Sequence, residues 1–323
     1  MATAAAPAAE GLDTLYVETT AFAEALTDGT SNVLRTTISS SDLGAYAAEF
    51  IDTGLADELG VSPDELQVAL LYTDDEFGTS IATAAEEALA DASAELVFDT
   101  SYPGDISDFS SALLQLDEND VDVVFHISQV ADGVLFWRQA QELDIDLPAV
   151  VGAGGGYGQD EFAEPLGENA DGLFNIVPPT SRSIDTGTLS DEAQDLLSRL
   201  DEKIEERGSS PGPYTDWAFM GTWVFLNDVA ANASEYSVEG FHEAAAGVDV
   251  DPSDSITGFG FSFAGEGEDN MGHNVNAEPV AQQWQGGELN VVYPEDYAVA
   301  DMVNVPLPAW ADRGGEIEET TDD

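Results

Sequence analysis

The chain contains no cysteine and has three histidines among its 323 residues. The absence of cysteine excludes disulfides, thiolate metal sites, iron–sulfur clusters and cysteine nucleophiles. The histidines, His126, His242 and His273, are isolated along the sequence and give no spaced pair of metal ligands. We therefore expect no metal site and no other cofactor.

Basic residues are also scarce, because seven Lys and Arg stand against 65 Asp and Glu, a formal net charge of -58. Nucleic acids and anionic membranes are bound by clustered Lys and Arg, so neither is expected as a partner. The acids recur between apolar positions along the whole chain, as a solvated surface over an ordinary core requires. Since molar salt shortens the screening length to about 3 Å, we interpret this surface as halophilic, that is, adapted to high salt.

Long apolar runs and enzyme motifs are missing as well. No run approaches the length of a membrane span, and residues 1–7 lack the charged start and apolar core of a signal peptide. There is no Gly-x-Ser-x-Gly elbow, and the glycine-rich segment 152–158 lacks the Lys-Ser/Thr pair of a nucleotide loop. We therefore expect neither membrane insertion nor enzymatic activity.

The sequence does contain short apolar runs that alternate with helical patterns. The runs are rich in Val, Ile, Leu and aromatics and are followed by Gly, Pro, Asp or Ser, which is typical of buried strands; they cover residues 15–17, 68–72, 95–98, 121–127, 149–151 and 173–177. Amphipathic helical patterns cover residues 79–92, 107–116 and 131–143. This alternation predicts an α/β domain with a doubly wound parallel sheet.

The pattern changes near residue 178. Two long helices are predicted over residues 191–207 and 215–233, followed by strands at 255–263 and 279–285 and the return arm of a hairpin at 286–293. Beyond Trp310 the chain is polar and acidic, which predicts a disordered tail.

The strand expected at residues 68–72 leads directly into Asp74, Asp75 and Glu76. Such acids can hold Mg2+ in a phosphoacceptor domain, but that chemistry also needs an Asp after a second strand and a nearby Lys. The next strand ends in His-Ile-Ser, and the single lysine, Lys203, lies far along the chain. We therefore interpret the three acids as surface charges that favour the start of the following helix.

Ligands of open parallel sheets bind beyond the carboxyl ends of the strands. The residues expected there offer hydroxyls, amides, bare backbone and aromatic rings, which suit the binding of a small polar molecule better than its conversion. The candidate ligand-binding residues are Thr19, Thr20, Phe22, Phe77, Gln129, Gly154 and Tyr157, with Gly78 and Ser128 beside them.

In order and spacing, several stretches resemble the substrate-binding proteins of branched-chain amino-acid and amide ABC transporters, the leucine/isoleucine/valine-binding type. The resemblance covers roughly residues 4–310, and its stretches are 18–27, 33–36, 67–78, 101–110, 137–143, 256–260 and 283–289. It implies a two-lobed type I periplasmic-binding-protein fold with a ligand cleft between the lobes. The first lobe would comprise residues 1–38 and 181–256, the second residues 39–180 and 257–305, and residues 306–323 would form the acidic tail.

The resemblance also implies roles for the site residues. In the family, the loop matching Thr19 to Phe22 holds the ligand carboxylate or amide, and an aromatic matching Phe77 packs over the ligand. A further aromatic matches Gln129 and Val130, and an acid matching Gly154 holds the ligand ammonium. This chain has Phe77 where the best-studied branch has Tyr, no ring at Gln129 or Val130, and no carboxylate at Gly154. An amide or urea-like compound is therefore as well suited as leucine or valine.

The implied function is capture of a small polar solute, with hinge closure around it and delivery to the ABC permease subunits in the membrane. A ligand-sensing receptor or regulator of the same two-lobed design is the alternative. Family members begin with a signal or lipoprotein segment and several further strand–helix units, so we expect this sequence to be a fragment with an incomplete, poorly supported first lobe. The full-length parent would lie outside the cell or at its surface.

Overall fold

The computed structural model of the chain describes residues 2–27, 31–268, 270–315 and 317. The chain divides into two compact units, which we call unit 1 (Met1–Ser40 and Pro178–Pro279) and unit 2 (Ser41–Val177 and Val280–Asp323). Each is described by itself. Within the described segments, no helix is both long and apolar enough to cross a membrane.

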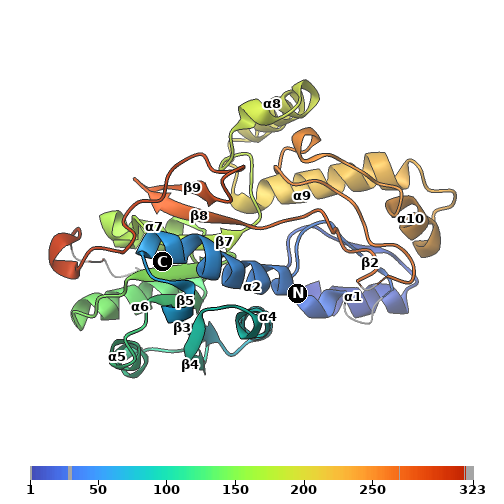
Figure 1. The fold of residues 1–323 in the computed structure, drawn as a ribbon. Coiled ribbons are helices and arrows are strands. Elements are labelled where there is room, and N and C mark those ends of the chain that lie inside the picture. Colours follow the sequence, from blue (N-terminus) through green and yellow to red (C-terminus); the bar gives the residue numbers. More distant parts are fainter. Residues whose placement is uncertain (1, 28–30, 269, 316, 318–323) are drawn as a thin grey trace. The chain divides into compact units, whose positions relative to one another are not determined.

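Unit 2 is built on a seven-stranded sheet in the order β4-β3-β5-β6-β7-β8-β9 (Figure 1). The strands are β3 (Gln67–Thr73), β4 (Glu95–Tyr102), β5 (Val123–Ile127), β6 (Ala149–Ala153), β7 (Phe174–Val177), β8 (Val280–Gln285) and β9 (Glu288–Tyr293). The pairs from β4 to β7 are parallel, and β8 and β9 add an antiparallel hairpin. The strand positions predicted from the apolar runs, and the hairpin, are confirmed.

The helices of unit 2 lie before and between its parallel strands along the chain. They are α2 (Ser40–Glu49), which continues through a π-helical stretch (Phe50–Leu55) into α3 (Ala56–Leu59), then α4 (Glu76–Asp91), α5 (Ser110–Glu118), α6 (Val130–Glu142) and α7 (Asp160–Leu166). The sequence patterns missed the helical segment from residue 40 to 59. Its Gly44 packs so closely on α4 that a Cβ there would lie 2.2 Å from the Ile81 carbonyl oxygen, so a side chain there would clash with α4.

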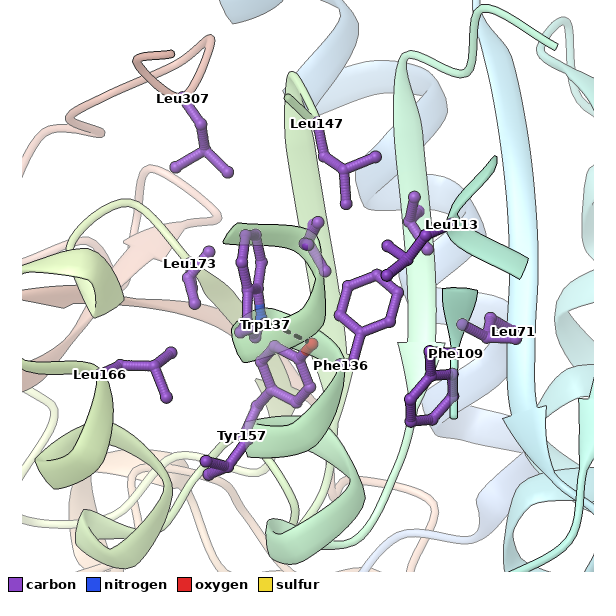
Figure 2. Packing of buried hydrophobic residues seen from close by; sticks show 14 of the residues in the cluster. Leu71, Phe109, Leu113, Phe136, Trp137, Leu147, Tyr157, Leu166, Leu173 and Leu307 are labelled. Carbon is purple, nitrogen blue, oxygen red and sulfur yellow. Dashed lines mark hydrogen bonds between the residues drawn. The ribbon is translucent and has the colours of Figure 1, made fainter. Parts of the chain in front are cut away.

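A large core cluster of unit 2 lies around Trp137, Phe136 and Tyr157, as Figure 2 shows. Leu307 and Trp310 are buried in it, so the start of the expected acidic tail 306–323 is a packed part of this unit. The indole N–H of Trp310 donates to the Ile145 carbonyl oxygen at 2.8 Å. Residues 316 and 318–323 lie outside the described residues.

Unit 1 contains a two-stranded parallel sheet of β1 (Tyr16–Glu18) and β2 (Val33–Arg35). Its helices are α1 (Ala2–Gly11), α8 (Asp191–Glu206), α9 (Pro213–Val224), which continues as a π-helical stretch (Phe225–Ala230), and α10 (Val238–Ala245). Short 3-10 turns in the two units cover Glu24–Leu26, Pro63–Glu65, Gly167–Ala170, Thr186–Thr188, Pro252–Asp254 and Trp310–Asp312.

Residues 257–279 belong to unit 1, whereas the family resemblance placed 257–305 in the second lobe. The reason is long-range pairing with β2: the Arg35 amide donates to the Gly272 carbonyl oxygen at 2.8 Å, and the Asn274 side chain donates to the Thr36 carbonyl oxygen at 3.1 Å. The prediction of a strand over residues 255–263 is also wrong, because the segment forms no continuous strand. That segment makes isolated bridges, at Phe261 and Phe263, and turns at Gly258 with φ +80°.

Candidate functional site

The turn from β3 into α4 carries the predicted ligand residue Phe77. Asp75 begins the helix as its N-cap, because its carboxylate accepts from the Gly78 amide at 2.8 Å and from the Thr73 hydroxyl at 3.0 Å. A Cβ at Gly78 would lie 2.1 Å from the Thr73 carbonyl oxygen, so glycine lets the helix start directly against the strand end. Phe77 is thereby held in the first helical turn with a half-buried ring.

The turn from β5 into α6 carries Ser128 and Gln129. Gln129 is the exposed N-cap residue of α6, and the Asp132 carboxylate accepts from its backbone amide at 3.2 Å. Ser128 is fully buried, and its hydroxyl has no hydrogen-bond partner among the described residues. This turn therefore presents the Gln129 amide outward and an unused hydroxyl beneath it.

The turn after β6 lies directly against the turn after β5. A Cβ at Gly156 would be 2.0 Å from the Ser128 carbonyl oxygen, so the approach requires glycine. Gly154 has φ +64°, donates its amide to the Ile176 carbonyl oxygen at 2.9 Å and accepts from the Asn175 side chain at 3.1 Å. The structure thus brings Ser128 and Gly156 together at the carboxyl edge of the sheet, with both hydrogen-bonding groups of the Gly154 backbone already used.

Tyr157 does not fit its predicted role as a ligand contact. Its side chain is fully buried in the unit 2 core, with its ring centroid 4.2 Å from that of Phe162 and its hydroxyl accepting from the Trp137 indole at 3.0 Å (Figure 2). The physical reason is the neighbouring Gly152, since a Cβ there would lie 2.3 Å from Tyr157 Cγ. The glycine leaves room for the ring to turn inward.

Tyr157 belongs to a buried polar chain that the sequence did not reveal. His126 Nδ1 lies 2.9 Å from the Tyr157 hydroxyl, His126 Nε2 lies 3.0 Å from the Tyr102 hydroxyl, and that hydroxyl donates to Asp132 at 2.7 Å. Since Tyr102 donates its proton to the carboxylate, it accepts from His126 Nε2–H, and Nδ1 then accepts from Tyr157. The chain therefore runs in one direction and ends at the carboxylate that caps α6.

Burial sets the protonation states in this chain. His126 is completely buried, and desolvation lowers its pKa to about 3, so the ring is neutral at physiological pH. Desolvation also raises the pKa of the Asp132 carboxyl, against the hydrogen bonds from Tyr102 and from the backbone, which lower it. The pKa values of Tyr102 and Tyr157 are raised by burial, and both keep their protons.

The loop after β1 in unit 1 contains Thr19, Thr20 and Phe22. Thr19 and Thr20 are half-buried, whereas the Phe22 side chain is buried, with its ring centroid 5.7 Å from that of Trp217. The Phe22 carbonyl oxygen accepts from Arg35 Nη1 at 3.0 Å and from the Ser40 amide at 2.7 Å. Phe22 therefore anchors the loop, and the two threonines are its more accessible residues.

Glu18, the last residue of β1, fills the inside of this loop. One of its carboxylate oxygens accepts from the backbone amides of Thr19, Thr20 and Ala21, each at 2.8 Å, and the other accepts from the Tyr16 hydroxyl at 2.5 Å. Burial, and then this carboxylate, raise the pKa of Tyr16. Sequence reasoning missed Glu18, because one acid among 65 carries no distinguishing signal except its place at a strand end.

A separate cavity of about 820 Å³ lies in unit 2, between α7, the β8–β9 turn and the segment 304–314. It contains none of the predicted ligand residues, and its lining includes the acids Asp160, Glu164 and Glu168 as well as Arg313. Because Asp171 precedes β7 and also lines it, the cavity is at the amino edge of the parallel strands. In the described part of the chain, no group of three or more His, Asp or Glu is placed to hold a metal ion.

Known proteins resemble the chain over most of its length. Residues 1–287 match the family model described as periplasmic binding protein. The chain is 30% identical over 302 residues to the Leu/Ile/Val-binding protein homolog 7 of Brucella suis, a match that covers 93% of this chain and 73% of that protein. A homolog 8 from Brucella abortus is 29% identical over 291 residues, 89% of this chain and 69% of that protein.

Solved structures share the fold at low sequence identity. A leucine binding protein from Thermotoga maritima superposes with a TM-score of 0.70 at 16% identity, covering 90% of this chain and 75% of that one. A branched-chain amino acid transporter substrate binding protein from Streptococcus pneumoniae, in complex with isoleucine, gives 0.68 at 20% identity, covering 90% and 76%. A solute binding protein from Rhodopseudomonas palustris, in complex with p-hydroxybenzoic acid, gives 0.69 at 16% identity, covering 96% and 77%.

Proposed function

We propose that this chain, which belongs to the periplasmic binding protein family, captures a small polar solute for an ABC transporter. The α/β fold predicted from the sequence, of the type I periplasmic-binding-protein kind, is confirmed by the family match and by the neighbouring structures. The family and these neighbours are substrate-binding proteins, which are not enzymes. Solute capture is the function that the homologues support.

The observation that carries the proposal is the match of residues 1–287 to the family, together with the local geometry of the strand ends. In unit 2, glycines allow the turns after β3, β5 and β6 to pack tightly against the strand ends. They hold the half-buried ring of Phe77 and the exposed side chain of Gln129 at the strand ends, whereas the unpartnered Ser128 hydroxyl is fully buried. An apolar surface with a few fixed polar groups is typical of a small-molecule site.

We also propose a membrane partner and a cellular location for this chain. The partner is an ABC permease in the membrane, which receives the solute from this chain, and the protein works outside the cytoplasmic membrane, as the family name implies. Branched-chain amino acids are tested first, because the homologues are described as Leu/Ile/Val-binding proteins. Amides and urea-like compounds are tested beside them, because Gly154 offers no carboxylate for a ligand ammonium.

A calorimetric solute screen in molar potassium chloride tests the proposal. We expect one of these classes to bind, and Phe77→Ala to weaken that binding about tenfold, since the ring contributes about 1 kcal/mol by stacking beyond its buried area. Tyr236→Ala is the matched control, because this tyrosine is 80% exposed in unit 1. Binding by none of the classes would overturn solute capture, and an unchanged affinity in Phe77→Ala would overturn the role of the ring.

A further inference from the structure

The loop after β1 is occupied by the chain's own carboxylate. Three consecutive backbone amides, of Thr19, Thr20 and Ala21, point at one oxygen of Glu18, each with a nitrogen–oxygen distance of 2.8 Å. Consecutive amides aimed at one point form a nest that binds anions. Glu18 is 5% exposed, so its carboxylate lies inside this nest as an integral part of the loop.

The second Glu18 oxygen is also held, by the Tyr16 hydroxyl at 2.5 Å. The carboxylate therefore has at least four short hydrogen bonds, three from the backbone and one from a phenol. Hydrogen bonds to a charged group contribute about 1.5–3 kcal/mol each when the alternative is water. An incoming anion would have to displace an acceptor that is already well bound.

The basic side chain that lies at this loop is held by the chain's own carbonyl oxygens. Arg35 is the basic residue nearest in the structure of unit 1, but it is completely buried, and its guanidinium donates to the carbonyl oxygens of Phe22 and Ala23 at 3.0 and 2.7 Å. Arg182 and Lys203 make ion pairs with Asp201 and Glu206 at α8. Arg35 is the register partner of Glu18 in the β1–β2 sheet, so its guanidinium braces the loop carbonyls and leaves the three amides to the Glu18 carboxylate.

We propose that the solute bound by this chain carries no carboxylate at the loop 18–22 and is a neutral amide or urea-like compound. This inference rests on the proposed function and narrows its solute class. The Thr20 hydroxyl donates to the Glu18 carboxylate at 3.5 Å, whereas the half-buried Thr19 hydroxyl can donate to a carbonyl oxygen or accept from an N–H. An amide offers both groups without a charge, whereas a carboxylate offers acceptors alone and meets Glu18 beneath the threonines.

Matched acid and amide probes test the inference directly. The affinities of isovalerate and isovaleramide, and of acetate and acetamide, are measured by calorimetry in molar potassium chloride, for the natural chain and for Glu18→Ala. We expect each amide to bind about tenfold more tightly than its acid in the natural chain. Glu18→Ala frees the three amides for a ligand carboxylate, so its affinity for the acids should rise about tenfold and the preference should disappear.

Two further variants control for charge and folding. Glu18→Gln keeps an oxygen in the nest and should retain the preference for amides. Glu10→Ala removes an exposed acid at the end of α1 and should change neither the affinities for the acids nor those for the amides. If Glu18→Ala does not fold, the comparison of acid and amide affinities in the natural chain tests the inference by itself. Acids binding as tightly as amides overturn the inference and leave solute capture standing, whereas a chain that binds none of the screened solutes overturns both.

Discussion

The strand ends of the two units use their acids differently. In unit 1, Glu18 at the end of β1 accepts from three consecutive amides of the loop that follows. In unit 2, Asp75 and Asp132 accept from amides at the starts of α4 and α6. The loop of unit 1 becomes a filled anion nest, whereas the turns of unit 2 become helix caps that leave the rings and amides beside them accessible.

Under the proposed function, this difference leaves recognition of polar groups to hydroxyls and side-chain amides rather than to backbone N–H groups. A backbone donor that is already paired contributes little to a ligand, because the ligand must replace an equally good acceptor. In a chain with 65 acids, internal carboxylates are available at many turns, including Asp122, which accepts from the Gln67 amide at 2.8 Å. The acids therefore serve the fold at specific turns as well as covering its surface.

The largest effect expected in unit 2 concerns the pH dependence of stability through His126. Its pKa falls from 6.5 in the unfolded chain to about 3 in the folded one, so below pH 6.5 the unfolded chain binds the proton first. Stability is then lost as the pH falls through this window, by about 2 kcal/mol between pH 7 and pH 5. Asp132 has a raised pKa and contributes a slope of the opposite sign.

Urea unfolding at pH 7 and pH 5 in molar salt measures this effect by comparing the natural chain with His126→Gln. The surface acids titrate in both proteins, so their contribution cancels in the difference. The variant should lose about 2 kcal/mol less than the natural chain on acidification. Equal losses would mean that His126 takes up a proton in the folded state, and the one-directional polar chain would then be wrong.

A smaller effect is expected at the cap of α4, the counterpart of Glu18 in unit 2. Asp75→Ala removes the acceptor for the Gly78 amide and should lower the free energy of unfolding by about 1 kcal/mol. Asp74→Ala is the control, because Asp74 is exposed and precedes the cap. If denaturation showed equal losses for both variants, general charge effects rather than capping would explain them.

The sequence predicted the sheet of unit 2 well because its strands are continuous apolar runs that end in turn residues. Local patterns do not reveal pairings between distant segments, such as the bridge of Arg35 with His273, and the assignment of residues 257–279 to the second lobe, which came from the family resemblance, did not take them into account. They also missed α2, whose small residues fit a close approach to α4 that is visible only after folding.

The candidate site was predictable in position but not in side-chain direction. The carboxyl-edge rule located Phe77, Gln129 and Gly154 at strand ends, where the structure has them. It also selected Tyr157, because a residue's place in the sequence does not tell whether a ring after several glycines turns outward or, as here, into the core. The ligand contacts of the accessible residues stay a prediction.

Hydrogen exchange at the amides of Thr19, Thr20 and Ala21 tests most directly whether Glu18 fills the loop of unit 1. These three signals are followed by NMR in molar salt for the solute-free natural chain and for Glu18→Ala. We predict that all three amides are protected in the natural chain without any solute, and that protection is lost in the variant. Exchange at the rate of open loops in the natural chain, with protection gained on adding leucine, would contradict the account.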